Sequence, residues 1–373
     1  MNNNKLSNHV RMIAFFLTAV ILICTFGFTV DGWQVNANDI TPPSNDKTPN
    51  TDVKDDPSRD DQNSNEQAGA PDVVIPDYIN SLTGMETTEE ISEYSPLAFI
   101  MDADDSCYGI SRSDILVEIP VENEKTRFIS FISDKDNLWK IGSLASGRDY
   151  INNIVKYFGG VAIYNAMDDL NDYESCDMSQ NCLDLSLKAG YHYTEQTSKS
   201  YTNCDLISSG LTSSGIHLEM NNSLTLPFGF NDFGNNSILL NKTASEIKIN
   251  QCNNAVIQLK FDAETRKYFY RKNGELMLDA LNGKNVDFTN CFILFADSVT
   301  YDNFKGCQTI VNTIGKGSGF YLTEGTYTEI IWSATKEGTM TFFLPDGTRL
   351  TVNRGTSYIC YVKSSKADSV IFT

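Results

Sequence analysis

The chain has 373 residues, which is enough for two ordinary domains, and 41% of them are hydrophobic, as in globular proteins. Its 48 Asp and Glu residues exceed its 29 Lys and Arg residues, and the formal net charge is −19. A surface of this average charge repels a phosphate backbone, so we expect no nucleic-acid partner.

An uncharged apolar segment occupies residues 12–30 and follows two basic residues. A run of about 20 apolar residues can cross a bilayer as a helix, and a basic flank keeps its start in the cytoplasm. We therefore expect the rest of the chain to be exported, with residues 1–37 acting as a membrane anchor or as a signal peptide cleaved near Ala37. Lipidation of Cys24 is disfavoured, because the isoleucine before it is too large for that position of a lipobox.

The next segment, residues 38–76, is rich in Asn, Asp, Pro, Ser and Thr and has almost no large apolar side chain before Val73. Such a segment cannot bury enough surface to offset the entropy lost on ordering. It is expected to be a disordered acidic linker that holds the folded part away from a membrane.

A mixed α/β domain is expected over residues 77–235. Apolar runs predict buried strands at 97–101, 115–121 and 127–132, and the first of them ends at Asp102. Period-two alternation in the second strand places Glu118 on the face opposite the apolar stripe.

A helix is expected to begin at Arg148 and to end at Gly159-Gly160. Its predicted buried stripe consists of Ile151, Ile154, Val155 and Phe158. A fourth strand is predicted at 161–164, and residues 167–235 show no clear pattern.

A β-rich domain is expected over residues 236–373. Alternating apolar residues predict one hairpin from 255–262 to 268–270 and another from 340–344 to 350–352. The glycines between 315 and 325 are interpreted as turns or bulges between strands. The predicted fold class is therefore α+β, with an antiparallel sandwich or barrel as the second domain.

In the order and spacing of short motifs, the chain resembles the YerB-like lipoproteins, a bacterial family of two domains without an assigned biochemical role. The motifs are Leu82-Thr83-Gly84, Met101-Asp102, Ser113-Asp114 to Glu118, Thr126-Arg127-Phe128, Lys140-Ile141-Gly142 with Arg148 after it, Tyr268 to Arg271, Gly315 to Gly319, Trp332 and Asp346-Gly347. The chain departs from the family at Ala103, Ala145 and Thr202-Asn203-Cys204, where the family has an asparagine, an arginine and a His-Asn pair. A polar site that these groups form in relatives would be lost or altered here.

Five ionisable side chains are candidates for a ligand pocket because they lie within or at the ends of the predicted strands and helix. They are Asp102, Asp114, Glu118, Arg127 and Arg148. Carboxylates near arginines can bind a polar ligand, or act as general acid and base where burial separates their pKa values. The alternative, which we favour, is a structural ion-pair network.

Cys307 is a second candidate, as a nucleophile, because Gly306-Cys307 resembles the Gly-Cys pair of L,D-transpeptidases. The neighbouring serine, arginine and activating histidine are missing, and a thiol needs such groups to react at neutral pH. Eight cysteines follow the apolar segment, and both disulfides and free buried thiols are consistent with that number.

Neither a metal nor a cofactor is expected. The acidic run at 102–105 lacks the glycine and the terminal acid of a calcium loop, and only His192 and His217 are left for a histidine site in the folded part. The glycines at 315–319 lack the Gly-Lys-Ser/Thr order of a phosphate-binding loop.

These observations predict an extracytoplasmic cell-envelope protein, attached to the membrane by its N-terminal segment or secreted after cleavage. We expect it to bind a cell-wall polymer, a peptide or an envelope protein, without catalysis, in a groove between its two domains. The alternative is a peptidoglycan hydrolase or transpeptidase that uses acidic residues or Cys307.

Overall fold

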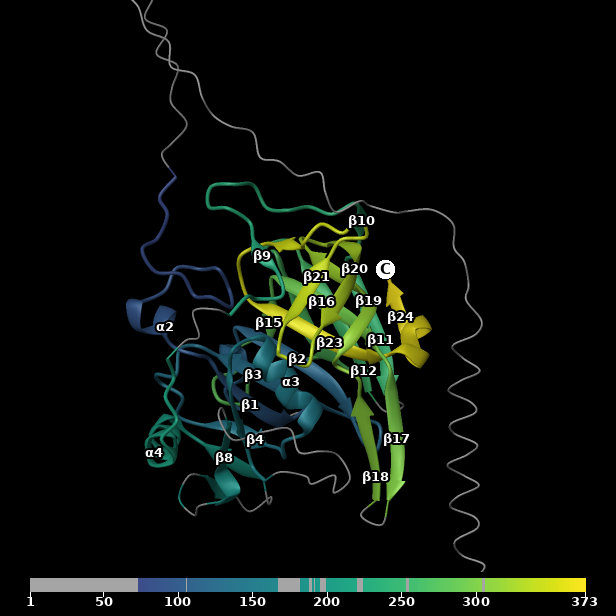
Figure 1. The fold of residues 1–373 in the computed structure, drawn as a ribbon. Helices are drawn as coiled ribbons and strands as arrows, with labels where there is room; N and C mark the ends of the chain where they lie inside the picture. The colour runs from purple at the N-terminus through teal and green to yellow at the C-terminus, as the bar shows by residue number, and fades with distance from the viewer. Residues whose placement is uncertain are drawn as a thin grey trace, which may run out of the picture. The chain divides into compact units, whose positions relative to one another are not determined.

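A computed structural model describes residues 73–104, 106–166, 182–187, 190, 192–194, 199–219, 224–252, 255–303 and 306–373. The predicted leader and the linker as far as residue 72 lie outside the described residues. Residues Gly69–Thr373 form one compact unit, which is mostly strand with few helices (Figure 1). In the described part of the chain, no helix is both long and apolar enough to cross a membrane.

The three strands predicted first lie side by side at the centre of the main sheet. They are β1 (Leu97–Asp102), β2 (Ile115–Val121) and β3 (Lys125–Ile132), and β3 runs antiparallel to both of its neighbours. All seven residues of β2 are buried, because both faces of the sheet are covered. The register places Asp102, Arg127 and Ile119 in one row across the three strands.

Helix α3 (Asp149–Tyr157) covers one face of these strands. Its predicted stripe is confirmed, since the four apolar side chains are at most 3% exposed. The helix begins one residue later than predicted: Arg148 is its N-cap residue and provides no side-chain cap. The predicted strand after it, β5 (Val161–Tyr164), pairs parallel to β1.

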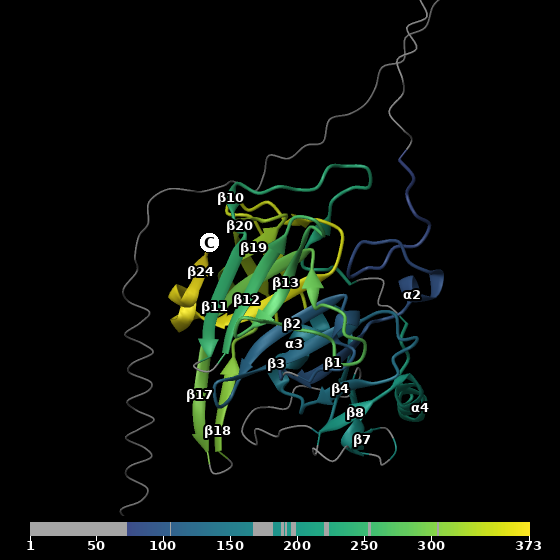
Figure 2. The ribbon, with the colours of Figure 1, turned by 180° about the vertical axis from the view of Figure 1, so that it is seen from behind.

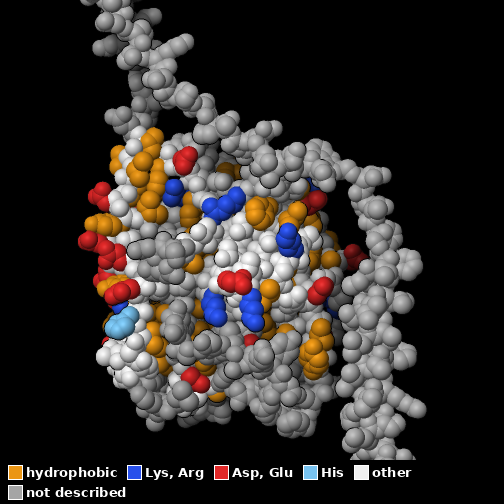
Figure 3. All heavy atoms as spheres, viewed as in Figure 1, with side chains coloured by type: hydrophobic (Ala, Val, Ile, Leu, Met, Phe, Trp, Pro, Cys, Tyr) orange, Lys and Arg blue, Asp and Glu red, His pale blue; other side chains and the backbone are white. Residues whose placement is uncertain are grey.

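Smaller elements complete this half of the chain. They are α2 (Glu89–Glu93), β4 (Ile141–Leu144), β6 (Cys182–Asp184), β7 (Tyr193–Thr194), β8 (Ser200–Thr202) and α4 (Cys204–Ser214). The exposed acids of α2 contribute to the acidic edge of the surface at the left of Figure 3.

The main sheet continues without a break into the second half of the chain. Its further strands are β16 (Asn290–Ala296), β19 (Gly315–Thr323), β20 (Thr326–Ala334), β21 (Met340–Phe343), β10 (Lys242–Thr243) and β23 (Ser357–Lys363), which brings the total to 14 strands. Strand β23 lies between β16 and β2 and is parallel to both. The C-terminal part of the chain therefore returns to the centre of the sheet and joins the two halves.

A second sheet packs on the face opposite α3 (Figure 2). It contains β11 (Glu246–Cys252), β12 (Ala255–Asp262), β13 (Lys267–Lys272), β14 (Glu275–Leu276), β15 (Asp287–Phe288) and β24 (Val370–Phe372). The predicted β12–β13 hairpin is confirmed, and Ile257 and Leu259 of its inner face join the core beneath β2 and β3.

The predicted fold class is confirmed: a mixed α/β region precedes a larger β-rich region. The second region is not purely antiparallel, because β23 runs parallel to β2 and β16. None of the sheets in the described ranges closes into a barrel. The domain boundary between residues 235 and 236 stays a prediction, since strands from both sides of it share one sheet.

Four further strands lie outside the two large sheets and form two pairs. Strands β17 (Ser298–Asn303) and β18 (Gly306–Val311) form a separate ribbon. The predicted hairpin at 340–352 turns as expected, with the Leu350 amide donating to the Phe342 carbonyl at 2.8 Å. After this hairpin, β22 (Thr351–Val352) pairs with β9 (Gly229–Phe230).

Candidate functional site

An arginine cluster lies where β1 and β2 end and β3 begins. Arg148 Nη2 donates to Glu122 Oε1 at 2.6 Å, and Arg127 Nη1 donates to the Ser146 carbonyl at 2.7 Å. Arg127 Nε lies 3.7 Å from Asp102 Oδ1. Three of the five candidates therefore meet here, together with Glu122, which the sequence analysis missed.

The two arginines of the arginine cluster are buried, whereas the Asp102 side chain at its edge is 54% exposed. The Arg148 side chain is 3% exposed and the Arg127 side chain 10% exposed. Burial and the neighbouring Arg148 lower the pKa of Arg127, and the Asp102 and Glu122 carboxylates partly offset this. Partial desolvation raises the pKa of Asp102, against the effect of Arg127. The cluster holds its charges by mutual contact and leaves little guanidinium surface for a ligand.

Glu118 lies on the opposite face of the same strands, in the core between the two sheets. The carboxyl group of this residue, which is 2% exposed, accepts three hydrogen bonds. Tyr358 donates at 2.6 Å and Tyr270 at 3.0 Å to Oε2, and Thr126 donates at 2.6 Å to Oε1. Burial raises the pKa of Glu118, and these hydrogen bonds offset only part of the rise. Glu118 is thus a buried junction between the two halves of the chain.

Asp114 is separate from both groups because it lies at the start of β2, whereas the arginine cluster lies at its end. At about 3.3 Å per residue, the distance along the strand from Asp114 to Ile119 is roughly 17 Å. Asp114 accepts hydrogen bonds from the Ser133 amide at 2.7 Å and from Asn80 Nδ2 at 3.3 Å. Burial raises its pKa, and the Ser133 amide lowers it in part. The expected convergence of five side chains at one edge is therefore corrected to three.

The remaining candidates do not form a reactive group in the described structure. Cys307 lies in β18, but its side chain lies outside the described part. Free thiols are found at Cys107, Cys182, Cys204, Cys291 and Cys360. Among the described residues, no group of three or more His, Cys, Asp or Glu could hold a metal ion. Asn203, at one of the positions where the chain departs from the expected family pattern, accepts from the Leu206 amide at 3.0 Å and caps α4.

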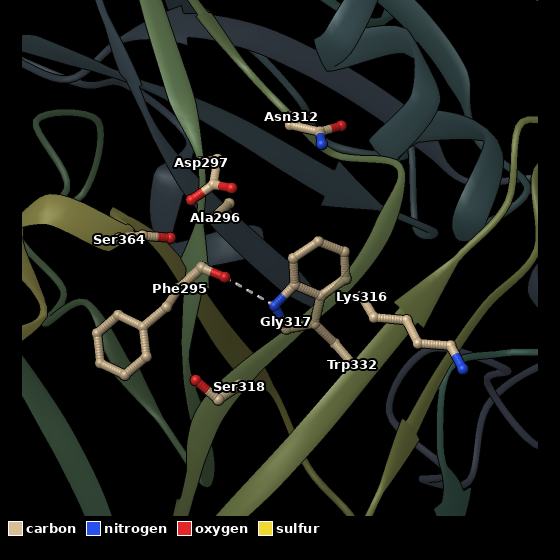
Figure 4. Close-up of a pocket in the computed structure, with 9 residues that line it drawn as sticks. All are labelled: Phe295, Ala296, Asp297, Asn312, Lys316, Gly317, Ser318, Trp332 and Ser364. Carbon is tan, nitrogen blue, oxygen red and sulfur yellow. Dashed lines mark hydrogen bonds between the residues drawn. The ribbon is translucent and has the colours of Figure 1, made fainter. Parts of the chain in front are cut away.

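A cleft of about 170 Å³ opens at one end of β16 and β19, as Figure 4 shows. The ladder between these strands ends at the pair Leu294 and Gly319. Beyond this pair, the indole of Trp332 fills the floor, and its Nε1 donates to the Phe295 carbonyl at 3.0 Å. The lining residues are Phe295, Ala296, Asp297, Asn312, Lys316, Gly317, Ser318, Trp332 and Ser364. The sequence analysis did not predict this cleft.

Gly317 is required by the close approach of Trp332. A Cβ atom at this position would lie 2.5 Å from Trp332 Nε1 and 2.5 Å from the Phe295 carbonyl oxygen. The sequence analysis assigned this glycine to a turn or bulge, and that interpretation is wrong: Gly317 lies within β19, where the absence of a side chain lets the indole reach its acceptor.

We expect Gly317→Ala to destabilise the protein by roughly 1 to 3 kcal/mol, because overpacking displaces the indole from its hydrogen bond. Guanidinium unfolding of the full-length protein measures this free energy. Gly229→Ala is the matched control, since its Cβ would meet nothing closer than Thr351 Oγ1 at 3.9 Å. Equal unfolding midpoints for the two variants would contradict the role assigned to Gly317.

Two family models match the chain over most of its described length. Residues 82–217 match "Protein of unknown function (DUF3048) N-terminal domain", and residues 247–359 match the corresponding C-terminal domain. The chain belongs to the DUF3048 family. The two halves of this DUF3048 protein correspond to the two domains of that family.

Two comparisons place this DUF3048 protein beside a bacterial relative. It is 23% identical over 292 residues to "Putative lipoprotein YerB" of Bacillus subtilis (strain 168), which covers 73% of this chain and 85% of the relative. The crystal structure of YerB from Bacillus subtilis superposes with a TM-score of 0.66 at 19% identity, covering 78% of this chain and 98% of that chain. The expected resemblance to the YerB-like lipoproteins is thereby confirmed, and at this identity the structural likeness supports the fold of the DUF3048 protein.

Proposed function

We propose that this protein is an extracytoplasmic, envelope-associated binding protein that takes a cell-wall component in the cleft of its second half, without catalysis. The observation that carries the proposal is the contrast between two kinds of polar group. The charged candidates of the first half have partners within the fold, either one another or neighbouring hydroxyl and amide groups, whereas Asp297 and Lys316 of the cleft have no side-chain partner among the described residues.

The envelope location is supported by the leader and by the relative. An apolar segment at 12–30 and an acidic linker at 38–76 suit a folded unit held outside the membrane. The relative carries the name "Putative lipoprotein YerB", which suits the same location. Retention of the leader, cleavage near Ala37 and attachment at Cys24 all concern residues outside the described part.

The alternative of acid–base hydrolysis fits the geometry less well. Asp102 lies in the row of Arg127 and Ile119, Glu118 lies in the next row, and the two carboxylates point to opposite faces of the sheet. The carboxyl group of Glu118 is buried and accepts hydrogen bonds from Tyr270 and Tyr358, so a substrate could not reach it unless the core opened. A general acid must come within hydrogen-bond distance of the atom it protonates.

The test is co-sedimentation of the full-length protein, kept in detergent micelles, with purified peptidoglycan sacculi. We expect the protein to sediment with the sacculi and to leave their muropeptides unchanged by mass spectrometry. Shortened or newly crosslinked muropeptides would show that the protein is an enzyme, and they would contradict the proposal of binding without catalysis. If the protein does not sediment at any concentration of sacculi, the proposal that its ligand is a cell-wall component is wrong.

A further inference from the structure

We propose that the cleft binds a dipolar ligand, one that carries an ammonium and a carboxylate, such as a free amino acid or a short unblocked peptide. This inference rests on the proposed function and names the ligand class of that site. It is carried by the two charged residues that line the cleft: in Figure 4 the Asp297 carboxylate lies on one side of the Trp332 indole, and the Lys316 side chain starts on the other side and extends away from it.

The two charges are held apart by the strands that carry them. Asp297 follows the last residue of β16, and Lys316 is the second residue of β19, beyond the point where the ladder between these strands ends. The indole of Trp332 occupies the gap between them and is fixed by its bond to Phe295. Both residues are exposed, so the Asp297 carboxylate and, after rotation of its flexible side chain, the Lys316 ammonium could each meet a complementary charge of a ligand that spans the indole.

The other polar groups of the cleft are available as well. The hydroxyl groups of Ser318 and Ser364 and the Asn312 amide nitrogen have no hydrogen-bond partner among the described residues, whereas Asn312 Oδ1 accepts from the Ile314 amide at 3.2 Å. A ligand with charged ends has polar atoms between them, as a peptide bond does. These neutral groups can orient such a ligand after the two charges attract it.

A neutral sugar or a phosphate group fits the same cleft less well. Sugars commonly stack on an exposed aromatic face, but Trp332 is 2% exposed and forms the floor. An anion would meet Lys316 and be repelled by Asp297, because the cleft has one charge of each sign. Only a ligand with both an ammonium and a carboxylate can pair with Asp297 and Lys316 at once.

The probe is D-alanyl-D-alanine, titrated into the full-length protein in detergent micelles by isothermal calorimetry. N-acetyl-D-alanyl-D-alanine lacks the ammonium, and D-alanyl-D-alanine amide lacks the carboxylate. We expect each blocked probe to bind about five- to tenfold more weakly, as is typical of one charged contact at a partly open site. N-acetylglucosamine serves as the uncharged comparison and is expected to bind more weakly than the free dipeptide.

The decisive result is a crossed loss of selectivity in two nearly isosteric variants. Asp297→Asn should bind the free dipeptide and its N-acetyl form equally, while still preferring a free carboxylate. Lys316→Gln should show the reverse. Asp346→Asn and Lys260→Gln, which change exposed charges elsewhere in the same half, should match the wild type. Thermal unfolding of each variant checks that it is folded.

Two outcomes overturn the inference: no measurable binding of the dipeptide, or equal binding of all three dipeptide probes. If either occurs while the protein still sediments with sacculi, the dipolar ligand is wrong and the proposed function stands. If sedimentation is lost too, both fail. Binding of N-acetylglucosamine in preference to the dipeptide would assign the cleft to sugars.

Discussion

Glu118→Ala is expected to destabilise the protein by about 3 kcal/mol or more, because one substitution removes the acceptor of three hydrogen bonds, two of them buried and one partly buried. Each buried hydroxyl left without a partner costs about 1 to 3 kcal/mol, and the cavity adds to this. Tyr270 and Tyr358 come from the second half of the chain, so the loss falls on the junction between the halves. Guanidinium unfolding of the full-length protein measures it.

Glu118→Gln is the matched variant, because an amide keeps the shape and removes the charge. Its oxygen can accept from both tyrosines, and its nitrogen can donate to Thr126 Oγ1. We expect it to lie within about 1 kcal/mol of the wild type near pH 4.5. A variant that is as damaging as alanine would show that an amide cannot replace the carboxyl group in this set of hydrogen bonds.

The same pair of proteins gives a pH dependence with a defined sign. Burial raises the pKa of Glu118 above its ordinary value of 4.5, so the folded protein retains a proton that the unfolded chain releases. The contribution of Glu118 to stability is therefore present in full below about pH 4.5 and is lost as pH rises through its folded-state pKa.

Glu118→Gln lacks this decline, so the difference in unfolding free energy between the variant and the wild type should grow in favour of the variant from pH 4.5 upward. Asp102 and Asp114, whose pKa values are also raised, act in both proteins and cancel in the difference. Parallel pH profiles for the two proteins would contradict the raised pKa of Glu118.

The central strands and the α3 stripe could be predicted from the sequence because burial on both faces leaves a continuous apolar run. The sequence also contains enough information to predict which candidates can share the arginine cluster. The short turn at residues 122–124 fixes the β2–β3 register, which places Arg127 opposite Ile119. Alternation then puts Glu118 on the other face. Grouping all five side chains at one edge neglected this alternation, which the sequence already indicated.

The partners of Glu118 could not be predicted in this way. Tyr270 and Tyr358 lie 152 and 240 residues away along the chain, and β23 was not predicted as a strand. The sequence did contain a signal for a central strand, the apolar run from Tyr358 to Val362, which is almost fully buried in the structure. Local patterns specify that such a run is buried, but its parallel pairing with β2 and β16 depends on tertiary contacts.

The cleft was missed for a different physical reason. The cleft exists because the β16–β19 ladder ends at Leu294 and Gly319. The indole of Trp332 from β20 forms the floor of the opening that this leaves, and neither feature has a periodic signature in the sequence. Gly317 and Gly319 carried the local signal, since a Cβ on either would lie within 2.5 Å of a carbonyl oxygen of β16. Glycine in a strand indicates close approach as often as a turn, and the close approach here depends on what β16 and β20 place beside it.

Arg148→Ala is expected to cost about 3 kcal/mol, because it leaves the Glu122 carboxylate largely buried without its nearest counter-ion. The Arg148 to Glu122 distance is 2.6 Å, whereas Arg127 Nη2 lies 4.0 Å from the same oxygen. The matched control is Arg112→Ala, which breaks a pair of equal length with Asp134 whose side chains are 27% and 47% exposed. For this more solvated pair we expect a loss below about 1 kcal/mol.

Adding Glu122→Gln to Arg148→Ala separates charge from packing. If the loss comes from the orphaned carboxylate, the double variant should be more stable than Arg148→Ala alone, with a coupling free energy of at least about 1 kcal/mol in a double-mutant cycle. Arg127 would tolerate the neutral glutamine, because the neighbouring guanidinium that lowers its pKa is removed in the same protein. A double variant with strictly additive losses would show that Arg148 acts through its packed side chain, as the N-cap residue of α3, and that its ion pair contributes little.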